Sequence, residues 1–215
     1  MPDNKHPVPV GEMSNAQRRR RDTIISAALD IFDRDGFEAA RMIDIAEKAG
    51  VAKGTLYLYF KTKEGMLEAM IGAVVLPTVE KLRAAAGTQE ESATLRLHRQ
   101  LLILAEQLSK GEMLKIMRLM VANGPQRERL RTFYFENVVA PNMKAINSTL
   151  KDGAANGEFS PSASDLDNML LAAPFVMAAF WKIMFQDISK LDDEMLFESV
   201  WTMAKTMVGV EASTS

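Results

Sequence analysis

The chain has 215 residues and a net charge of −2, with 47% hydrophobic and 25% charged residues, the composition of an ordinary globular protein. It contains no cysteine, which excludes disulfides, thiolate metal sites and cysteine nucleophiles. Residues 1–15 are polar and proline-containing and do not read as a signal peptide, and no apolar run reaches the roughly 20 residues that span a bilayer. We therefore expect a soluble, cytoplasmic protein with a disordered tail over residues 1–15.

Helical patterning begins directly after this tail. Apolar residues recur at spacings of three and four over residues 15–35, which predicts a helix that Gly36 ends. Short helices are predicted over about 42–49 and 53–59. A fourth helix should begin near Thr62, whose hydroxyl suits an N-cap position.

The rest of the chain also has helical patterning, which prolines interrupt. Pro77 is expected to bend or break the fourth helix, and Pro141 to kink a long helix near its middle. The predicted helices cover about 90–108, 112–121, 125–152, 163–185 and 192–208, with a loop over 153–162. Because no segment alternates with the period of a strand, the predicted fold class is all-α.

Residues 45–57 have the pattern of a helix–turn–helix unit. Ala46 is small at the point where the two helices cross, and Gly50 permits a tight turn that a β-carbon would strain. Ile45, Val51 and Leu56 can supply a shared core. This spacing alone is moderately specific for a DNA-binding unit.

The wider stretch, over about residues 20–70, resembles the DNA-binding domain of the TetR family of bacterial transcriptional regulators. The residues that carry the resemblance are Phe32, Gly36, Phe37, Asp44, Ile45, Ala46, Ala49, Gly50, Val51, Lys53, Gly54, Thr55, Leu56, Tyr57, Tyr59, Phe60, Lys63 and Glu64. The resemblance implies an N-terminal three-helix DNA-binding domain, a larger C-terminal helical domain for ligand binding and dimerisation, and function as a homodimer. We place these domains at residues 16–63 and 64–210.

The start of the second helix of the unit is expected to enter the major groove and meet base edges. Lys53 can donate to guanine O6 and N7 or to a phosphate, and Thr55 can offer a hydroxyl or a methyl group. Gly54 lets the backbone approach closely. Ala52 stands where many family members carry a capping serine, so this helix end should lack a side-chain cap.

Further contacts are expected with the DNA backbone. In the family, the positions of Tyr57, Tyr59 and Lys63 tend to hold phosphates, which fixes register without reading sequence. Arg41 stands where a hydroxyl residue is common and could contact a phosphate through its charge. The run Arg18–Arg21 is either a solvated charged face or a basic arm that meets DNA in an adjacent groove.

The C-terminal two-thirds of the chain carries no recognisable catalytic or metal-binding constellation, so neither enzyme activity nor a cofactor is expected. The chain has 15 methionines, and these flexible side chains suit a pocket for varied apolar ligands. The candidate pocket residues are Met113, Met117, Phe133, Asn137, Phe175 and Trp181. The alternative for any one of them is an ordinary core, and a less favoured alternative for the methionines is a copper(I) site.

The last two predicted helices, 163–185 and 192–208, are apolar around most of their circumference. Such helices are buried on more than one side. We expect them to form half of a four-helix dimer interface, as the resemblance implies.

Together these features predict a transcriptional repressor that leaves an inverted-repeat operator when a mostly apolar small molecule binds. The alternative is a regulator of the same fold that has no small-molecule effector and answers to a protein partner. A third hypothesis is a helical ligand-binding or enzymatic protein with an incidental helix–turn–helix, which the absence of paired acid–base residues disfavours.

Overall fold

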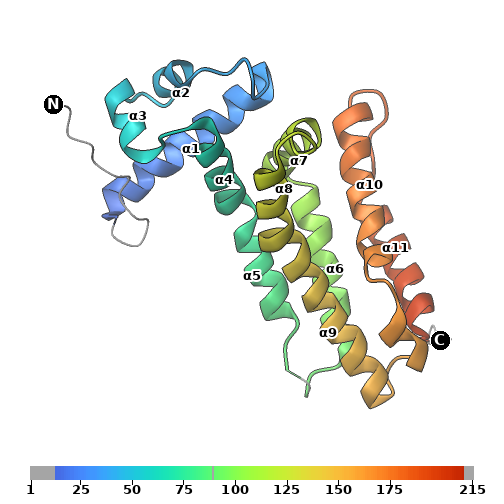
Figure 1. Ribbon diagram of the computed structural model, residues 1–215. Helices are drawn as coiled ribbons and strands as arrows, with labels where there is room; N and C mark the ends of the chain where they lie inside the picture. The colour runs from blue at the N-terminus through green and yellow to red at the C-terminus, as the bar shows by residue number, and fades with distance from the viewer. Residues whose placement is uncertain (1–12, 89, 211–215) are drawn as a thin grey trace. The chain divides into compact units, whose positions relative to one another are not determined.

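A computed structural model describes residues 13–88 and 90–210, and within these ranges every regular element is a helix (Figure 1). The all-α prediction is therefore confirmed. The chain divides into two compact units. Unit 1 comprises the described residues up to Val75 together with Lys115–Tyr134, and unit 2 comprises Leu76–Leu114 and the described residues from Phe135 onward.

Unit 1 is built around its first helix. Its helices are α1 (Asn15–Asp35), α2 (Met42–Lys48), α3 (Lys53–Tyr59), α4 (Lys63–Val74), the later part of α7 (Gly111–Asn123) and α8 (Glu128–Tyr134). Ser14 caps α1 in a capping box with Gln17, and Gly36 ends α1 with φ of 78°. The apolar stripe of α1 is buried against α2 and α4, because its apolar residues share one helical face.

Unit 2 is organised around α6. Its elements are α5 (Leu76–Ala85), α6 (Ala93–Leu108), the first residues of α7, the π-helix η2 (Phe135–Val139), α9 (Ala140–Asn156), the 3₁₀-helix η3 (Pro161–Asp165), α10 (Met169–Phe185) and α11 (Asp193–Val208). Helix α6 packs against α5, α9, α10 and α11 (Figure 1). Its Leu97, Leu101 and Leu104 are buried in the core of this unit.

Several expected helix boundaries are confirmed, and the helical pattern changes near both Pro77 and Pro141. Helices α1 and α3 have the predicted ends, and α4 stops at Val74, three residues before Pro77. The helix predicted from residue 125 begins only at Glu128. The π-helix η2 ends at Val139, two residues before Pro141, which has no N–H to donate to the preceding turn.

The prediction was wrong for residues 153–168. Helix α9 continues through Gly153 to Asn156 and ends at Gly157, which has a φ of 82°. Gly153 stays helical, and the Phe159 ring packs on it so closely that a β-carbon there would clash with the ring. The helix expected from residue 163 is instead the 3₁₀-helix η3, and α10 starts only at Met169. Most of the tail expected over 1–15 lies outside the described residues. Within the described ranges, no helix has both the length and the apolar character that a membrane span needs.

Candidate nucleic-acid interface

Helices α2 and α3 form the predicted helix–turn–helix in unit 1. The Gly50 N–H donates to Glu47 O at 3.1 Å and the Val51 N–H to Ala46 O at 3.0 Å, with Gly50 at φ of 65°. Leu56 of α3 is fully buried. The tight turn and this shared core place α3 across α2, with the start of α3 at the surface.

The first turn of α3 is open to solvent. Ala52 is the N-cap residue and makes no side-chain cap hydrogen bond, as the sequence predicts. Lys53 and Gly54 are exposed, and Thr55 is partly exposed. A β-carbon at Gly54 would have no neighbouring atom within 4 Å. The protein's own packing therefore does not require this glycine, and another molecule can approach the backbone here.

Lys53 is an available cation in this turn. No ion pair of Lys53 is found among the residues that the structure describes. Its ammonium group is therefore able to meet a base or a phosphate without breaking an intramolecular contact.

Leu58 was missed by the sequence reasoning, although it lies on the same helix. Its side chain is 47% exposed. Leu58 follows Gly54 by four residues, so the two share a face of α3. A residue two positions after the buried Leu56 points away from the core of a helix, so the sequence could have identified Leu58 as exposed. An exposed aliphatic group at this place can contact a thymine methyl group.

The two tyrosines of α3 have an intermediate exposure. Tyr57 and Tyr59 are neither fully buried nor free in solvent. Part of the surface of each residue is accessible, which leaves the predicted contacts with the DNA backbone sterically possible.

Arg41, the N-cap residue of α2, forms a bidentate ion pair within the unit. Its Nε and Nη2 donate to the two carboxylate oxygens of Asp44 at 2.8 and 2.6 Å. This guanidinium holds the pKa of Asp44 below its usual range. The Arg41 side chain is 72% exposed, so it can still face a phosphate, but its charge is partly neutralised.

Lys63 has a different environment from the one the resemblance implies. Its Nζ donates to the carbonyl oxygens of Phe37, Glu38 and Ala40 at 2.7, 2.9 and 3.1 Å. An ammonium group has three protons, and all three are used in these bonds. Lys63 therefore holds the loop before α2, and a phosphate contact would have to displace one of these carbonyl groups.

In the basic run of α1, the side chains of Arg18 and Arg21 make described contacts within the unit, and those of Arg19 and Arg20 do not. Arg18 Nε donates to Met13 O at 3.1 Å, and Arg21 lies 5.6 Å from the centroid of the Phe60 ring. Arg19 and Arg20 are exposed. Only these two are presented to solvent without a described intramolecular role.

The predicted pocket residues are not gathered around a described cavity. Met113 and Met117 lie in α7 and are buried, while Phe133 of α8 and Asn137 of η2 are partly buried. The remaining two lie in α10. Phe175 stacks on Phe197 in the core, with ring centroids 6.4 Å apart, and Trp181 is 40% exposed and donates from Nε1 to Ser189 O. The hollow beside Phe175 has a volume of about 10 Å³, room for at most about one water molecule.

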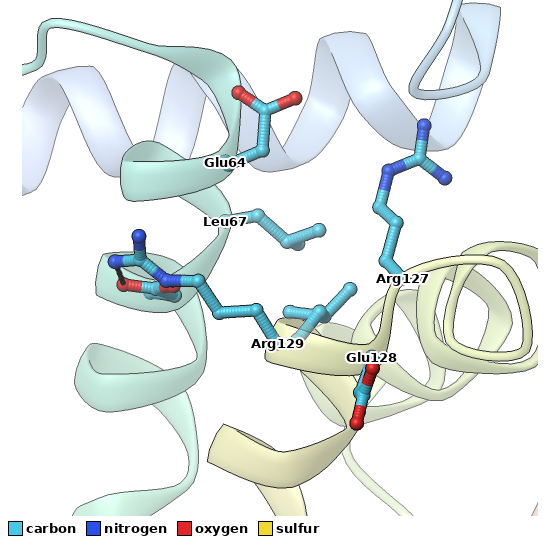
Figure 2. Close-up of a pocket in the computed structure, with 7 residues that line it drawn as sticks. Glu64, Leu67, Arg127, Glu128 and Arg129 are labelled. Atoms are coloured by element: carbon cyan, nitrogen blue, oxygen red, sulfur yellow. Dashed lines mark hydrogen bonds and ion pairs between the residues drawn. The ribbon is translucent and has the colours of Figure 1, made fainter.

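A larger hollow lies within unit 1, between α4 and α8, with a volume of about 250 Å³ (Figure 2). Leu67 and Leu130 are its apolar residues. Arg129 donates from Nε to Glu68 at 2.9 Å on its wall. The lining of this hollow contains none of the predicted pocket residues.

The part of the chain that contains α2 and α3 is similar to known regulatory proteins. Residues 24–70 match the family described as bacterial regulatory proteins, tetR family. Over 59 residues the chain is 48% identical to the HTH-type transcriptional repressor KstR of Mycolicibacterium smegmatis. That match covers 27% of this chain and 29% of KstR, so less than a third of the relative's length is compared.

The similarity in fold extends over most of the chain. The structure is similar to a transcriptional regulator of the TetR/AcrR family from Thermobifida fusca, with a TM-score of 0.61 and 26% identity over 90% of this chain and 100% of that one. It is also similar to Bacillus subtilis FadR in complex with stearoyl-CoA, with a TM-score of 0.66 and 21% identity over 89% and 99% of the two chains.

Proposed function

We propose that the chain, whose residues 24–70 match the family of bacterial regulatory proteins described as tetR, is a DNA-binding transcriptional repressor of that family. The observation that carries this proposal is the open first turn of α3, where an unpaired lysine precedes a glycine that internal packing does not require. Such a turn can approach the floor of a major groove. The named relatives are regulators, so the proposed activity is binding and not catalysis.

The proposed division of labour follows the exposure of each side chain. Lys53, Gly54 and Thr55 meet base edges, with Lys53 donating to guanine and the Gly54 backbone lying close to the DNA. Leu58 packs on a thymine methyl group. These contacts read sequence, because base edges differ between base pairs.

Other residues are proposed to fix register on the phosphates. Tyr57 and Tyr59 contact the backbone with their accessible edges, and Arg41 does so while it stays paired with Asp44. Lys63 supports the site from within, by holding the carbonyl groups that precede α2. This role replaces the phosphate contact that the resemblance implies.

We propose that the functional form is a homodimer built on α10 and α11 of unit 2. A continuous series of large apolar residues along and just after α10 is exposed in the single chain, comprising Met169, Leu170, Val176, Met177, Trp181, Met184, Phe185 and Ile188. Monomeric proteins rarely expose so extended an apolar face. A two-fold dimer would cover it, and its operator would be an inverted repeat.

A mostly apolar small molecule is the proposed effector. The stearoyl-CoA bound to the similar FadR fold is an apolar chain with a polar end, and the methionine-rich composition of this chain suits such a ligand. The hollow between α4 and α8 is a place where a ligand could displace α4, the helix that follows the helix–turn–helix. The alternative remains a regulator of this fold that answers to a protein partner.

Two experiments test the proposal. Selection of duplexes from a random-sequence library should enrich an inverted repeat, with binding that weakens steeply as salt rises. A thermal-shift screen of apolar acids and acyl thioesters, followed by titration of any stabilising compound into the DNA complex, should release the DNA. A compound that stabilises the protein but leaves DNA affinity unchanged would remove the effector part and favour partner control.

A further inference from the structure

The loop between α1 and α2 contacts two cationic side chains, Lys63 and Arg127, that lie far from it in the sequence. Phe37 in this loop is 2% exposed. Lys63 Nζ lies 4.9 Å from the centroid of its ring, and Arg127 Cζ lies 4.5 Å from the same centroid. Phe32 of α1 packs against the ring as well, with centroids 5.2 Å apart. The ring is therefore fixed by α1 and by two charged side chains.

Arg127 also holds the next residue of the loop. Its Nη2 forms an ion pair with the Glu38 carboxylate, and its Nη1 donates to Asn123 Oδ1 at 3.3 Å. The Arg127 side chain is 23% exposed. It extends in the opposite direction from the neighbouring Glu128 (Figure 2). The guanidinium is thus committed to the loop and is not a free surface charge.

The start of α2 depends on these tertiary contacts. Arg41 is the N-cap residue of α2 and provides no side-chain cap hydrogen bond. A helix of 7 residues is too short to be stable alone. The loop that the two cations hold is therefore what sets where α2 begins, and α3 follows α2 through the tight turn at Gly50.

We propose that Arg127 is a positioning residue for DNA binding, acting through Phe37 and Glu38 to fix the orientation of the helix–turn–helix. The inference rests on the proposed DNA-binding function. Arg127 lies outside residues 24–70, the segment that matches the family. It belongs to residues 115–134, which pack in unit 1 but are joined at both ends to unit 2. The placement of α3 thus depends on a segment that is continuous with the larger unit.

The expected effect is moderate, because cation–π contacts and partly exposed ion pairs are individually weak. Arg127→Ala should weaken binding to a duplex selected by the wild-type protein about tenfold, which corresponds to about 1.4 kcal/mol. Arg127→Lys keeps a cation over Phe37 and near Glu38, so it should recover most of the loss. Arg131→Ala is the matched control, because Arg131 is exposed on α8 and no side-chain contact between it and the loop is found among the described residues.

The salt dependence separates positioning from direct contact. A positioning residue leaves the number of phosphate contacts unchanged, so log Kd for Arg127→Ala should keep the wild-type slope against log salt. A slope lowered by about one would mean that Arg127 touches a phosphate, and it would overturn the proposal. Equal affinity of Arg127→Ala and wild type for the selected duplex would overturn it too.

Two further measurements test the route through the loop. Combined with Phe37→Leu, Arg127→Ala should cost less than it does alone, because the pair shares one contact. Hydrogen exchange in Arg127→Ala should rise in the loop and in α2 while α1 and α4 keep their protection. Additive losses, or a rise throughout unit 1, would contradict the proposal. If the wild type selects no duplex at all, the proposed function itself fails. If the wild type binds and Arg127→Ala binds equally, only the role of Arg127 fails.

Discussion

Two lysines of the DNA-binding unit show how surroundings decide a residue's role. Lys53 is exposed, and no ion pair of it is found among the described residues. Lys63 lies only ten positions further along the chain and uses its ammonium protons on three backbone carbonyl oxygens. The ammonium group of Lys53 is thus available to DNA, whereas that of Lys63 is used in hydrogen bonds within the protein.

Replacing Lys53 should affect DNA binding and leave folding unchanged. We expect Lys53→Ala to weaken binding to a selected duplex by about 1–3 kcal/mol if its contact is bidentate, and to relax preference at one base pair of each half-site. The melting temperature should stay close to that of the wild type, because exposed substitutions are usually neutral. Lys81→Ala, an exposed lysine of α5, is the control. Unchanged affinity for Lys53→Ala would contradict the role given to the first turn of α3.

Replacing Lys63 should lower the stability of the fold and leave the number of phosphate contacts unchanged. Lys63→Met keeps the aliphatic stem but leaves three carbonyl groups without their donor, and hydrogen bonds to charged groups contribute about 1.5–3 kcal/mol. We expect a lower midpoint of denaturant unfolding and an unchanged slope of log Kd against log salt. A slope lowered by about one, with normal stability, would instead restore the phosphate contact.

Replacing Gly54 should weaken DNA binding without lowering the stability of the fold. Its added β-carbon would meet no atom of the protein within 4 Å, and alanine is the better helix former by up to about 1 kcal/mol. Gly54→Ala should therefore melt at the same or a higher temperature and bind the selected duplex more weakly. A variant that binds as well as the wild type would show that the backbone does not approach DNA at this point.

At the scale of helices, the sequence predicts elements well where local signals determine them. Gly36 and the Ser14 cap bound α1, and Thr62 caps α4 by accepting from the Gly65 N–H at 3.1 Å. The loop expected from Gly153 was wrong, because Gly157 with its φ of 82° ends α9, while Gly153 stays helical with the Phe159 ring packed on it. Contacts of that kind depend on how the chain folds back, which residue types alone do not reveal.

A second long-range contact sets the start of α6, which begins at Ala93 and not near residue 90. The Glu158 carboxylate accepts from the Ser92 hydroxyl and from the backbone N–H groups of Ala93 and Thr94, at 2.7, 3.0 and 3.1 Å. Burial works to raise the pKa of Glu158, but these hydrogen bonds outweigh it and bring the pKa to about 2. The carboxylate therefore supplies a helix cap from a distant loop.

This cap should give a pH-dependent contribution to stability. A pKa lowered by folding stabilises the folded state above the unfolded value of 4.5 and loses this effect as pH falls through about 2. Glu158→Gln should be less stable than the wild type at neutral pH by about 0.5–2 kcal/mol, as for other lost caps. Thermal melts should show the difference shrinking between pH 4.5 and 2, while Glu106→Gln, an exposed control on α6, shows none. A difference that does not change with pH would contradict the assignment.

At the scale of the whole molecule, the effector pocket was the part that the sequence predicted least. Apolar periodicity identifies which side chains face inward, but it does not show whether the space between them is filled. Met113 and Phe175 are buried as expected, yet the hollow beside Phe175 holds about 10 Å³. The helix–turn–helix was predictable because its signals, a turn glycine between two short helices with apolar residues at helical spacing, are local.

Assembly is best tested on the exposed face of α10. Trp201 packs within unit 2, with its ring centroid 4.8 Å from that of His98, so a charge there would damage the fold as well as an interface. Met177 is 65% exposed, so Met177→Glu should leave the monomer folded and place a charge in the proposed interface. Light scattering at micromolar concentration should find a dimeric wild type and a monomeric variant with normal helicity. A monomeric wild type would contradict the proposed assembly.

The central claim is that the first turn of α3 reads operator DNA in a two-fold complex. Selection from a random duplex library tests it most directly, followed by affinity measurements over a range of salt. The account predicts an enriched inverted repeat whose half-sites lie about one DNA turn, or 34–36 Å, apart, and which Lys53→Ala binds more weakly. An absence of any enriched sequence, or an enriched sequence that Lys53→Ala and Gly54→Ala bind as tightly as the wild type does, would contradict it.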